Sequence, residues 1–229
     1  MSRLYLPWWR RRHAGKLAEL QRNRPELLFL GDSITQDWEL AGPEPWRDFR
    51  PAWQAFYGDR HAVNLGFKGD TTAHLLWRMQ NGELDGIAPK AAVVLIGANN
   101  LGRVHWSAGD TVLGVAAVIA ELRQRLPRAA VLLLGVLPSD RGAWVARTTE
   151  EVNGALAARY GGSAEPGVTF MDVGALFLRD GRIDRTLFLD PLLTPPEPAL
   201  HPTAEGQRQL SEAIEPTLAG LLGDRRHPS

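Results

Sequence analysis

The chain has 229 residues, of which 44% are hydrophobic and 23% are charged, so it is long enough for one sizeable domain with a large core. Its 26 Lys and Arg residues balance its 26 Asp and Glu residues, and this zero net charge gives no support to nucleic acid or an anionic membrane as the main partner. The chain has no cysteine, which excludes disulfides, thiolate catalysis and cysteine-based zinc sites.

The first 25 residues predict a flanking helix. Its segment PWWRRR, residues 7–12, suits either an amphipathic contact with a membrane or partner, or a helix that packs two tryptophans on the domain and leaves three arginines in solvent; the second is favoured. No apolar run approaches the roughly 18–20 residues that span a bilayer, so stable membrane insertion is not expected. The start also lacks a stretch typical of a signal peptide, which favours a cytoplasmic protein as the sequence is written. A secreted or periplasmic protein whose leader had been removed would look the same.

Five short apolar runs follow along the chain and predict the strands of one sheet. They are rich in Val, Leu and Ile without clean alternation, which is typical of strands covered on both faces of a parallel sheet. The predicted strands are ELLFLGD (26–32), AVNLGF (62–67), AAVVLIGAN (91–99), AAVLLLGVLP (129–138) and GVTFMDV (167–173).

Helical patterns lie between and after these runs, with apolar residues at steps of three and four. Pro216 should kink the last of these helices or divide it in two, because proline lacks the N–H that an interior helical position donates. The alternation of strand and helix predicts an α/β fold, as one three-layer α/β/α domain over residues 1–229. The predicted helices cover residues 71–84, 110–126, 147–161 and 203–223.

Glycines and polar residues follow the first three predicted strands, where ligands of open parallel sheets bind. Gly31-Asp32-Ser33 follows the first strand, GFKGDTT (66–72) the second, and Gly97-Ala98-Asn99-Asn100 the third. His201 lies in the segment DPLLTPPEPALHP (190–202), whose prolines indicate a stiff loop. These are the parts that acyl transfer needs: a serine, a base that activates it, and donors for an oxyanion.

Each of these motifs also has a structural interpretation. A Gly-Asp-Ser tripeptide after a strand is more often a plain turn, and Gly66 and Gly69 suit loop positions with positive φ. Asn99 and Asn100 suit an Asx-type helix start, and a single histidine such as His201 is most often a surface residue. The order and spacing of the four motifs favour the catalytic interpretation.

Taken together, the motifs resemble the SGNH, or GDSL-type, esterase and lipase superfamily, whose sequence blocks carry Ser, Gly, Asn and His. The likeness extends from about residue 26 to 222. Residues 64–100 are similar to the catalytic subunits of the intracellular platelet-activating factor acetylhydrolases. The resemblance implies a flavodoxin-like architecture with about five parallel strands. The block residues correspond to Ser33, Gly69, Asn99 and His201.

The resemblance implies a role for each matched residue. Ser33 is the expected nucleophile, and His201 is its general base and then the acid for the leaving group. The expected oxyanion hole combines the backbone N–H groups of Ser33 and Gly69 with the side-chain amide of Asn99.

The triad acid departs from the family pattern. The family places it three residues before the histidine, and Pro198 occupies that position here. Asp190 is the favoured replacement, with residues 191–200 looping out and returning as an insertion. Glu197 is nearer in sequence and is the alternative. A third hypothesis is a Ser–His dyad in which a backbone carbonyl orients the imidazole.

Several residues beside the motifs also have both a structural and a functional interpretation. Asp32 and Asp70 are expected to brace loops rather than take part in the chemistry. Lys68 stands where the family usually has a small residue, and a solvated side chain is favoured over one that points into the site. Trp38 and Leu200 are the candidate substrate-binding residues, although packing in the core is the favoured interpretation for the segment that contains Trp38.

The sequence therefore predicts a serine esterase that hydrolyses carboxylic esters through an acyl-serine intermediate, and the resemblance favours a short acyl group such as acetyl. A thioesterase or acyltransferase with the same residues is one alternative, and a binding protein on an inactive hydrolase fold is another. No metal or other cofactor is expected, since the remaining histidines lack the spacing of a metal site. The expected partner is a small-molecule ester, and a homodimer is expected by analogy alone.

Overall fold

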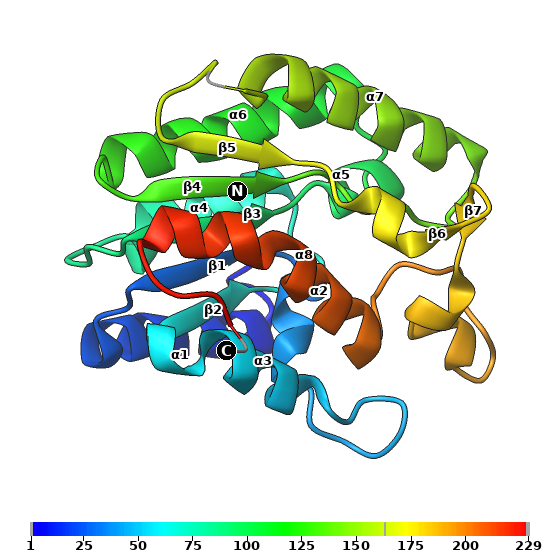
Figure 1. Ribbon diagram of the computed structural model, residues 1–229, viewed down its shortest axis with the longest axis horizontal. Coiled ribbons are helices and arrows are strands. Elements are labelled where there is room, and N and C mark those ends of the chain that lie inside the picture. Colours follow the sequence, from blue (N-terminus) through cyan, green and yellow to red (C-terminus); the bar gives the residue numbers. More distant parts are fainter. Residues whose placement is uncertain (1, 163, 228–229) are drawn as a thin grey trace.

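The computed structural model describes residues 2–162 and 164–227, and a sheet of five parallel strands runs through its centre (Figure 1). The strand order is β2-β1-β3-β4-β5. Each strand lies within one of the five predicted runs, so the prediction of a five-stranded parallel sheet is confirmed. The strands are β1 (Leu27–Gly31), β2 (Ala62–Gly66), β3 (Ala91–Leu95), β4 (Ala130–Leu134) and β5 (Val168–Met171).

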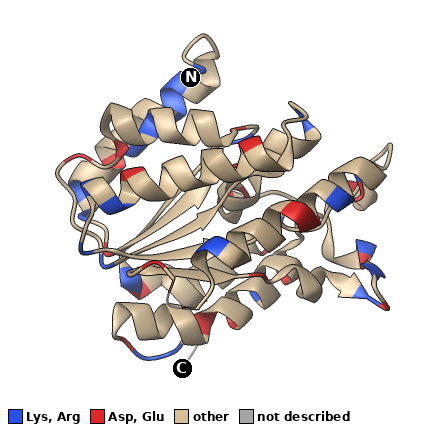
Figure 2. Ribbon diagram, turned by 90° about the horizontal axis from the view of Figure 1, so that it is seen from above, with Lys and Arg blue, Asp and Glu red and all other residues tan. Residues whose placement is uncertain are grey.

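The central strand β1 pairs in parallel with both of its neighbours. Leu28 lies opposite Val63 of β2 and Ala92 of β3. All residues of β1 and β3 are buried, because helices cover both faces of the sheet. Strands without a solvent face need no alternating polarity, which explains their continuous apolar sequences. Figure 2 shows the consequence: the charged residues lie on helices and loops, and the five strands carry none.

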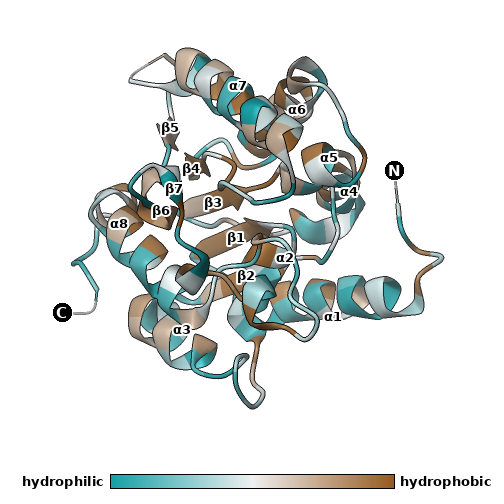
Figure 3. Cartoon of the chain, turned by 90° about the vertical axis from the view of Figure 1, so that its right-hand side faces the viewer, coloured by the Kyte–Doolittle hydropathy of each residue, from teal (hydrophilic) through white to brown (hydrophobic). Residues whose placement is uncertain are grey.

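Helices form a layer on each face of the sheet (Figure 3). On one face α3 (Phe49–Tyr57) packs against α8 (Ala204–Leu222). On the other face lie α4 (Thr72–Arg78), α6 (Ala108–Arg125) and α7 (Ala143–Tyr160). Two short helices, α2 (Ser33–Gln36) and α5 (Ala98–Gly102), directly follow β1 and β3 and so lie at the carboxyl ends of the strands. The three-layer prediction is confirmed.

The N-terminal helix α1 (Pro7–Asn23) contacts β2 at the edge of the sheet. Trp9 is fully buried, but Trp8 remains 37% exposed, so one of the two tryptophans packs fully on the domain. The first two arginines of PWWRRR are exposed. The third, Arg12, donates hydrogen bonds to the Gly66 carbonyl at 2.8 Å and to Glu39 at 2.7 Å. Throughout the described residues, no helix is both long and apolar enough to cross a membrane.

The last helix is not divided at Pro216, which removes one of the two outcomes that the sequence predicts. α8 continues unbroken through this proline. Proline has no N–H to donate to the Glu212 carbonyl, and both Pro216 and Glu212 are exposed, so the unpaired carbonyl lies on the solvent side of the helix. The opposite side packs Ile214 and Leu218 into the core, one on each side of the proline, which stabilises the helix through this position.

A small antiparallel hairpin precedes the proline-rich segment. It consists of β6 (Leu178–Arg179) and β7 (Arg182–Ile183). The sequence did not predict it, because strands of two residues are too short for a periodic pattern.

Candidate active site

Ser33, His201 and Asp190 form a continuous hydrogen-bonded series. The Ser33 hydroxyl is 2.9 Å from Nε2 of His201, and Nδ1 of the same ring is 2.6 Å from Oδ1 of Asp190. An ionised carboxylate only accepts hydrogen bonds, so the ring nitrogen that faces Asp190 carries the proton. Nε2 is then the acceptor for the serine hydroxyl, which is the arrangement that a general base requires.

The segment between Asp190 and His201 leaves the site and returns to it. A 3₁₀ turn begins at Asp190, and at the other end of the loop the N–H groups of Leu200 and His201 donate to Asp190 Oδ2 at 2.8 and 2.6 Å. The Leu189 N–H donates to the His201 carbonyl at 2.7 Å and closes the base of the loop. One carboxylate thus binds the imidazole with one oxygen and the backbone beside it with the other.

The carboxylate that faces the imidazole is that of Asp190 rather than Glu197. Glu197 is exposed on the loop, and its backbone N–H donates to the Asp190 carbonyl at 3.0 Å. Burial raises the pKa of the Asp190 carboxyl, but hydrogen bonds from His201 and Leu200 outweigh burial and hold that pKa below its usual value. Burial lowers the pKa of His201, but the hydrogen bond and charge of Asp190 outweigh it and raise the pKa above 6.5.

Ser33 is the first residue of α2, directly after the N-cap residue Asp32. Oδ1 of Asp32 accepts the Ile34 N–H at 3.0 Å, so the cap engages the N–H that follows the serine. In the described part of the chain, the N–H of Ser33 itself has no acceptor. Asp32 is 1% exposed, and burial raises its pKa to about 6.

Gly69 lies in a tight turn after β2. The Asp70 N–H donates to the Phe67 carbonyl at 3.1 Å, and Gly69 has φ of +73°, as the third position of a type II turn requires. The Lys68 N–H donates to the Gln36 side chain at 2.8 Å, which ties the turn to α2. No acceptor for the Gly69 N–H occurs among the described residues, so this donor is available to a ligand.

Asn99 reaches the same turn from α5. Its Nδ2 donates to the Asp70 carbonyl at 3.1 Å and to Oδ2 of Asp32 at 3.3 Å. These two acceptors fix which end of the amide faces the turn. The bond to Asp32 is at the long end of the range for N–H···O bonds, so it is the weaker of the two. The structure therefore gathers five sequence candidates at one edge of the sheet: Ser33, Gly69, Asn99, Asp190 and His201.

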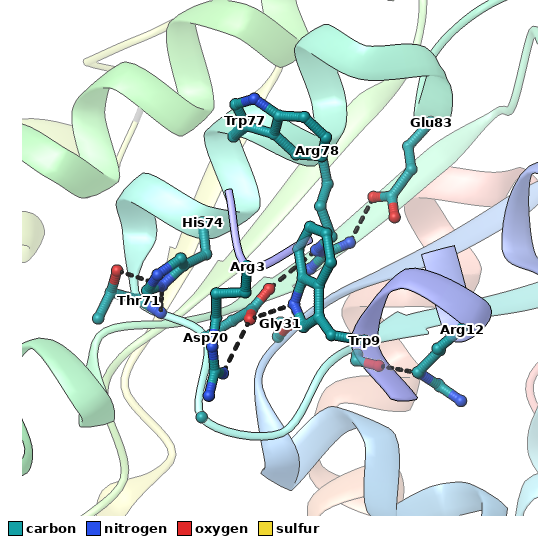
Figure 4. A network of polar contacts seen from close by, with 12 residues as sticks. Arg3, Trp9, Arg12, Gly31, Asp70, Thr71, His74, Trp77, Arg78 and Glu83 are labelled. Carbon is teal, nitrogen blue, oxygen red and sulfur yellow. Dashed lines mark hydrogen bonds and ion pairs between the residues drawn. The ribbon is translucent and has the colours of Figure 1, made fainter. Parts of the chain in front are cut away.

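The Asp70 carboxylate stabilises the Gly69 turn through a buried network of hydrogen bonds (Figure 4). Its carboxylate is inaccessible to solvent and accepts hydrogen bonds from Trp9 Nε1 at 2.8 Å and Arg78 Nε at 2.9 Å. Arg3 Nη1 lies 3.4 Å from the same carboxylate and donates to the Lys68 carbonyl at 2.7 Å. Asp70 thus braces the loop, in the way expected from the sequence.

The remaining sequence candidates lie around this group. Lys68 is half exposed, and its ammonium pairs with Asp37 at 3.4 Å. Trp38 is 4% exposed and packs on Trp53 with ring centroids 5.8 Å apart, so it is a core residue here. Leu200 is partly buried beside the histidine and packs against the core. Within residues 2–162 and 164–227, no cluster of three or more His, Asp or Glu side chains is arranged to hold a metal ion.

Sequence reasoning missed the residues that support the turn. Trp9 and Arg3 are 61 and 67 residues away from Asp70 in sequence. No local spacing marks such a contact, since it arises only when α1 packs on the edge of the sheet. The one available signal was the tryptophan pair in an otherwise polar helix.

Comparison with known proteins identifies the family. The model of the GDSL-like lipase/acylhydrolase family matches residues 29–209. The chain is 34% identical over 177 residues to the platelet-activating factor acetylhydrolase IB subunit alpha2 of Gallus gallus, which covers 76% of this chain and 71% of that protein. It is 33% identical over 216 residues to the alpha1 subunit of Homo sapiens, which covers 93% of this chain and 84% of that subunit.

A solved structure shows the same fold. A GDSL-like lipase from Bacteroides thetaiotaomicron superposes with a TM-score of 0.67 over 92% of this chain and 97% of its own, at 17% identity. The match to the family model contains all five gathered residues. The chain belongs to the GDSL-like lipase/acylhydrolase family and is a carboxylic ester hydrolase.

Proposed function

We propose that this hydrolase is a serine esterase that acts on short-chain esters, acetyl esters first, through an acyl-Ser33 intermediate. The observation that carries the proposal is the hydrogen-bonded series from the Ser33 hydroxyl through His201 to Asp190, at 2.9 and 2.6 Å. A serine hydroxyl is a weak nucleophile unless a neighbouring base accepts its proton. The series supplies that base and the group that orients it.

In the first half of the reaction, the Ser33 oxygen attacks the ester carbonyl carbon and its proton passes to Nε2 of His201. The carbonyl oxygen becomes an oxyanion, which accepts hydrogen bonds from the N–H groups of Ser33 and Gly69 and from Asn99 Nδ2. The Asp190 carboxylate stabilises the imidazolium that forms. The bond to the leaving alcohol then breaks, and His201 returns the proton to the leaving oxygen.

In the second half, water attacks the acyl group on Ser33 and gives its proton to His201. The same oxyanion hole stabilises the second tetrahedral intermediate. The bond between the acyl carbon and the Ser33 oxygen breaks, and His201 returns the proton to that oxygen. The carboxylic acid leaves, and the site regains its starting state.

The preference for a short acyl group rests on the relatives. Both curated relatives are named acetylhydrolases, and they cover most of this chain. Those names apply to those proteins, and they support acetyl as the first acyl group to test here.

The test is release of p-nitrophenol from p-nitrophenyl acetate. We expect Ser33→Ala to lower kcat/KM by at least about 10³-fold, since removal of a triad nucleophile leaves only binding and the oxyanion hole. Ser107→Ala, which removes an exposed hydroxyl at the start of α6, is the matched control and should retain activity. Acetate should be hydrolysed faster than butyrate and octanoate.

Two other outcomes would reassign the function. Background rates in both the wild type and Ser33→Ala would support a binding protein on the hydrolase fold. Faster turnover of acetyl thioesters than of acetyl oxygen esters of similar leaving group would support a thioesterase.

A further inference from the structure

The loop after β4 contacts both the helix that carries Asn99 and the segment that carries His201. Nη2 of Arg141 donates to the Ala98 carbonyl at 2.8 Å, next to Asn99 of the proposed oxyanion hole. The N–H of the preceding residue, Asp140, donates to the Ala199 carbonyl at 2.9 Å, two residues before the histidine. The Arg141 guanidinium is therefore held at the edge where the ester is expected to bind.

This guanidinium is partly buried and has no carboxylate partner among the described residues. Its Nε donates to the Ser139 hydroxyl at 3.3 Å. The neighbouring Asp140 pairs instead with Arg185, at 3.8 Å. For the Arg141 Nη1, the described part of the chain offers no acceptor. A partly desolvated cation without an anion is unfavourable, and a bound anion would relieve that cost.

The charges of two carboxylates in the site oppose the lowering of the Arg141 pKa by burial, although neither carboxylate forms an ion pair with it. Burial lowers the pKa of Arg141, and the charges of Asp32 and Asp190 counteract burial only in part. Both carboxylates have other partners, because Asp190 binds His201 and Asp32 accepts hydrogen bonds from Ile34 and Asn99. Neither carboxylate is therefore an ion-pair partner of the guanidinium, which is held by its hydrogen bonds to Ala98 and Ser139.

A second arginine lies beside the Gly69 turn. Nη1 of Arg103, at the end of α5, is 3.4 Å from the Gly69 carbonyl, and Arg103 forms no ion pair with a described carboxylate. On the same helix, a Cβ at Gly102 would lie 2.1 Å from Cζ of Arg141, so the glycine allows that guanidinium to pack on α5. The Arg141 guanidinium thus packs on the helix that carries Asn99, and the Arg103 guanidinium extends from the end of that helix to Gly69. Neither forms an ion pair with the described residues.

We propose that Arg141, together with Arg103, forms an anion-binding subsite beside the oxyanion hole, and that the natural substrate is an ester carrying a carboxylate or phosphate group near the scissile bond. The planar guanidinium fork suits the oxygens of both groups. Because the net charge of the chain is zero, this attraction is local to the site rather than a property of the whole surface. The inference rests on the proposed esterase function and names its substrate class.

The test compares acetyl esters that differ in charge. The probes are 4-acetoxybenzoate, its neutral methyl ester and 4-acetoxyphenyl phosphate, and the readout is the ratio of kcat/KM for each anionic ester to that for the neutral one. In Arg141→Gln we expect this ratio to fall by roughly 10-fold or more relative to wild type, as a lost charged hydrogen bond implies. Leaving-group differences cancel, since each probe is compared with itself across variants.

Control variants separate recognition from structure. Arg141→Lys should recover part of the ratio, and Arg147→Gln, at an exposed arginine of α7, should leave it unchanged. If Arg141→Gln slows all three esters equally, Arg141 only supports the loop and the proposal is overturned. If Arg141→Gln does not fold, the proposal is judged on Arg103→Gln and on inhibition of the wild type by inorganic phosphate against sodium chloride of equal ionic strength. Unchanged ratios in Arg103→Gln and equal inhibition by the two salts would overturn it.

The same assays keep this inference distinct from the proposed function. Hydrolysis by Ser33→Ala at the wild-type rate would contradict the proposed esterase mechanism itself. An inactive Ser33→Ala together with unchanged ratios in the arginine variants would remove only the anion subsite. A larger fall for the phosphate ester than for the carboxylate ester would identify phosphate as the preferred group, and the reverse would identify carboxylate.

Discussion

At the scale of single residues, Asp190 raises the pKa of His201, so it should set the pH range in which His201 can act as the proposed base. The carboxylate raises the pKa of His201 above 6.5 although burial of the ring acts in the opposite direction. In Asp190→Asn the raising interactions are lost and burial remains, so the acid limb of the kcat/KM profile should move to lower pH. The rate itself should fall by about 10⁴-fold, as in other triads that lose their acid. The measurement is kcat/KM for p-nitrophenyl acetate from about pH 5 to 9.

The matched control for Asp190 is Glu197→Gln, which removes the exposed acid of the same loop. It should leave both the rate and the profile unchanged. Near wild-type activity in Asp190→Asn with a loss in Glu197→Gln would transfer the role to Glu197. Activity retained in both variants would favour the Ser–His dyad.

Asp32 is a second residue whose ionisation should be measurable. Burial raises its pKa from 3.8 to about 6, so the folded protein binds this proton more tightly than the unfolded chain. The stabilising contribution of the protonated acid is therefore complete below about pH 3.8 and is lost as the pH rises through about 6, a change of about 3 kcal/mol in the free energy of unfolding. Asp32→Asn lacks this term, so its stability relative to wild type should improve as the pH is raised.

Urea unfolding of wild type and Asp32→Asn at about pH 4.5 and 7.5 checks this expectation. The difference between the two proteins cancels the other titrating groups to first order. A stability difference that is the same at both pH values would show that the Asp32 carboxyl titrates normally.

At the scale of elements, the sheet was predictable because its strands are buried on both faces. β1 and β3 show continuous apolar sequences that stop where Gly31-Asp32-Ser33 and Gly97-Ala98-Asn99 begin, and parallel strands bring those ends to one edge. Ser33, Gly69, Asn99 and His201 could therefore be proposed together from sequence and family resemblance.

Other features depend on tertiary contacts that no local pattern records. The return of residues 191–200 to Asp190 relies on backbone hydrogen bonds to that carboxylate, which left Asp190 and Glu197 as rivals in the sequence. The continuity of α8 through Pro216 relies on which side of the helix faces the core. The position of the Gly69 turn depends on α1, whose Trp9 binds Asp70 from more than sixty residues away in sequence.

The contact of α1 with the turn leads to a prediction for Trp9. Trp9→Phe removes the indole N–H that binds the buried Asp70 carboxylate at 2.8 Å. The free energy of unfolding should fall by about 1.5–3 kcal/mol, as expected for a hydrogen bond to a buried charge. Because Asp70 adjoins Gly69, kcat should fall while KM changes little, since the oxyanion donor is needed chiefly in the transition state.

Trp8→Phe is the control for this prediction, since Trp8 neighbours Trp9 but is 37% exposed. Urea unfolding and p-nitrophenyl acetate kinetics of the two variants are the measurements. Loss of stability in Trp9→Phe with unchanged kcat would show that α1 holds the fold but does not position the turn.

At the scale of the whole molecule, α8 connects the two ends of the sheet. It begins three residues after His201, at the carboxyl end of the strands. In its second half, Glu215 accepts two hydrogen bonds from Arg60 at 2.7 Å, and Arg60 also binds Asp224, just after the helix, at 2.9 Å. Arg60 precedes β2, so this ion cluster lies at the end of the sheet opposite to the proposed catalytic residues. Stability and catalysis should therefore be separable.

Arg60→Met tests that separation. It leaves Glu215, which is 3% exposed, without its cation, and breaking a buried pair in this way costs about 3–5 kcal/mol. We expect a large fall in the urea midpoint but an unchanged kcat/KM for p-nitrophenyl acetate at 25 °C, because the five residues of β2, roughly 16 Å of strand, separate Arg60 from the Gly69 turn. Arg50→Met, at an exposed arginine of α3, should change neither quantity. A fall in kcat/KM of folded Arg60→Met would mean that α8 transmits its docking to His201, and that the two ends of the molecule are coupled.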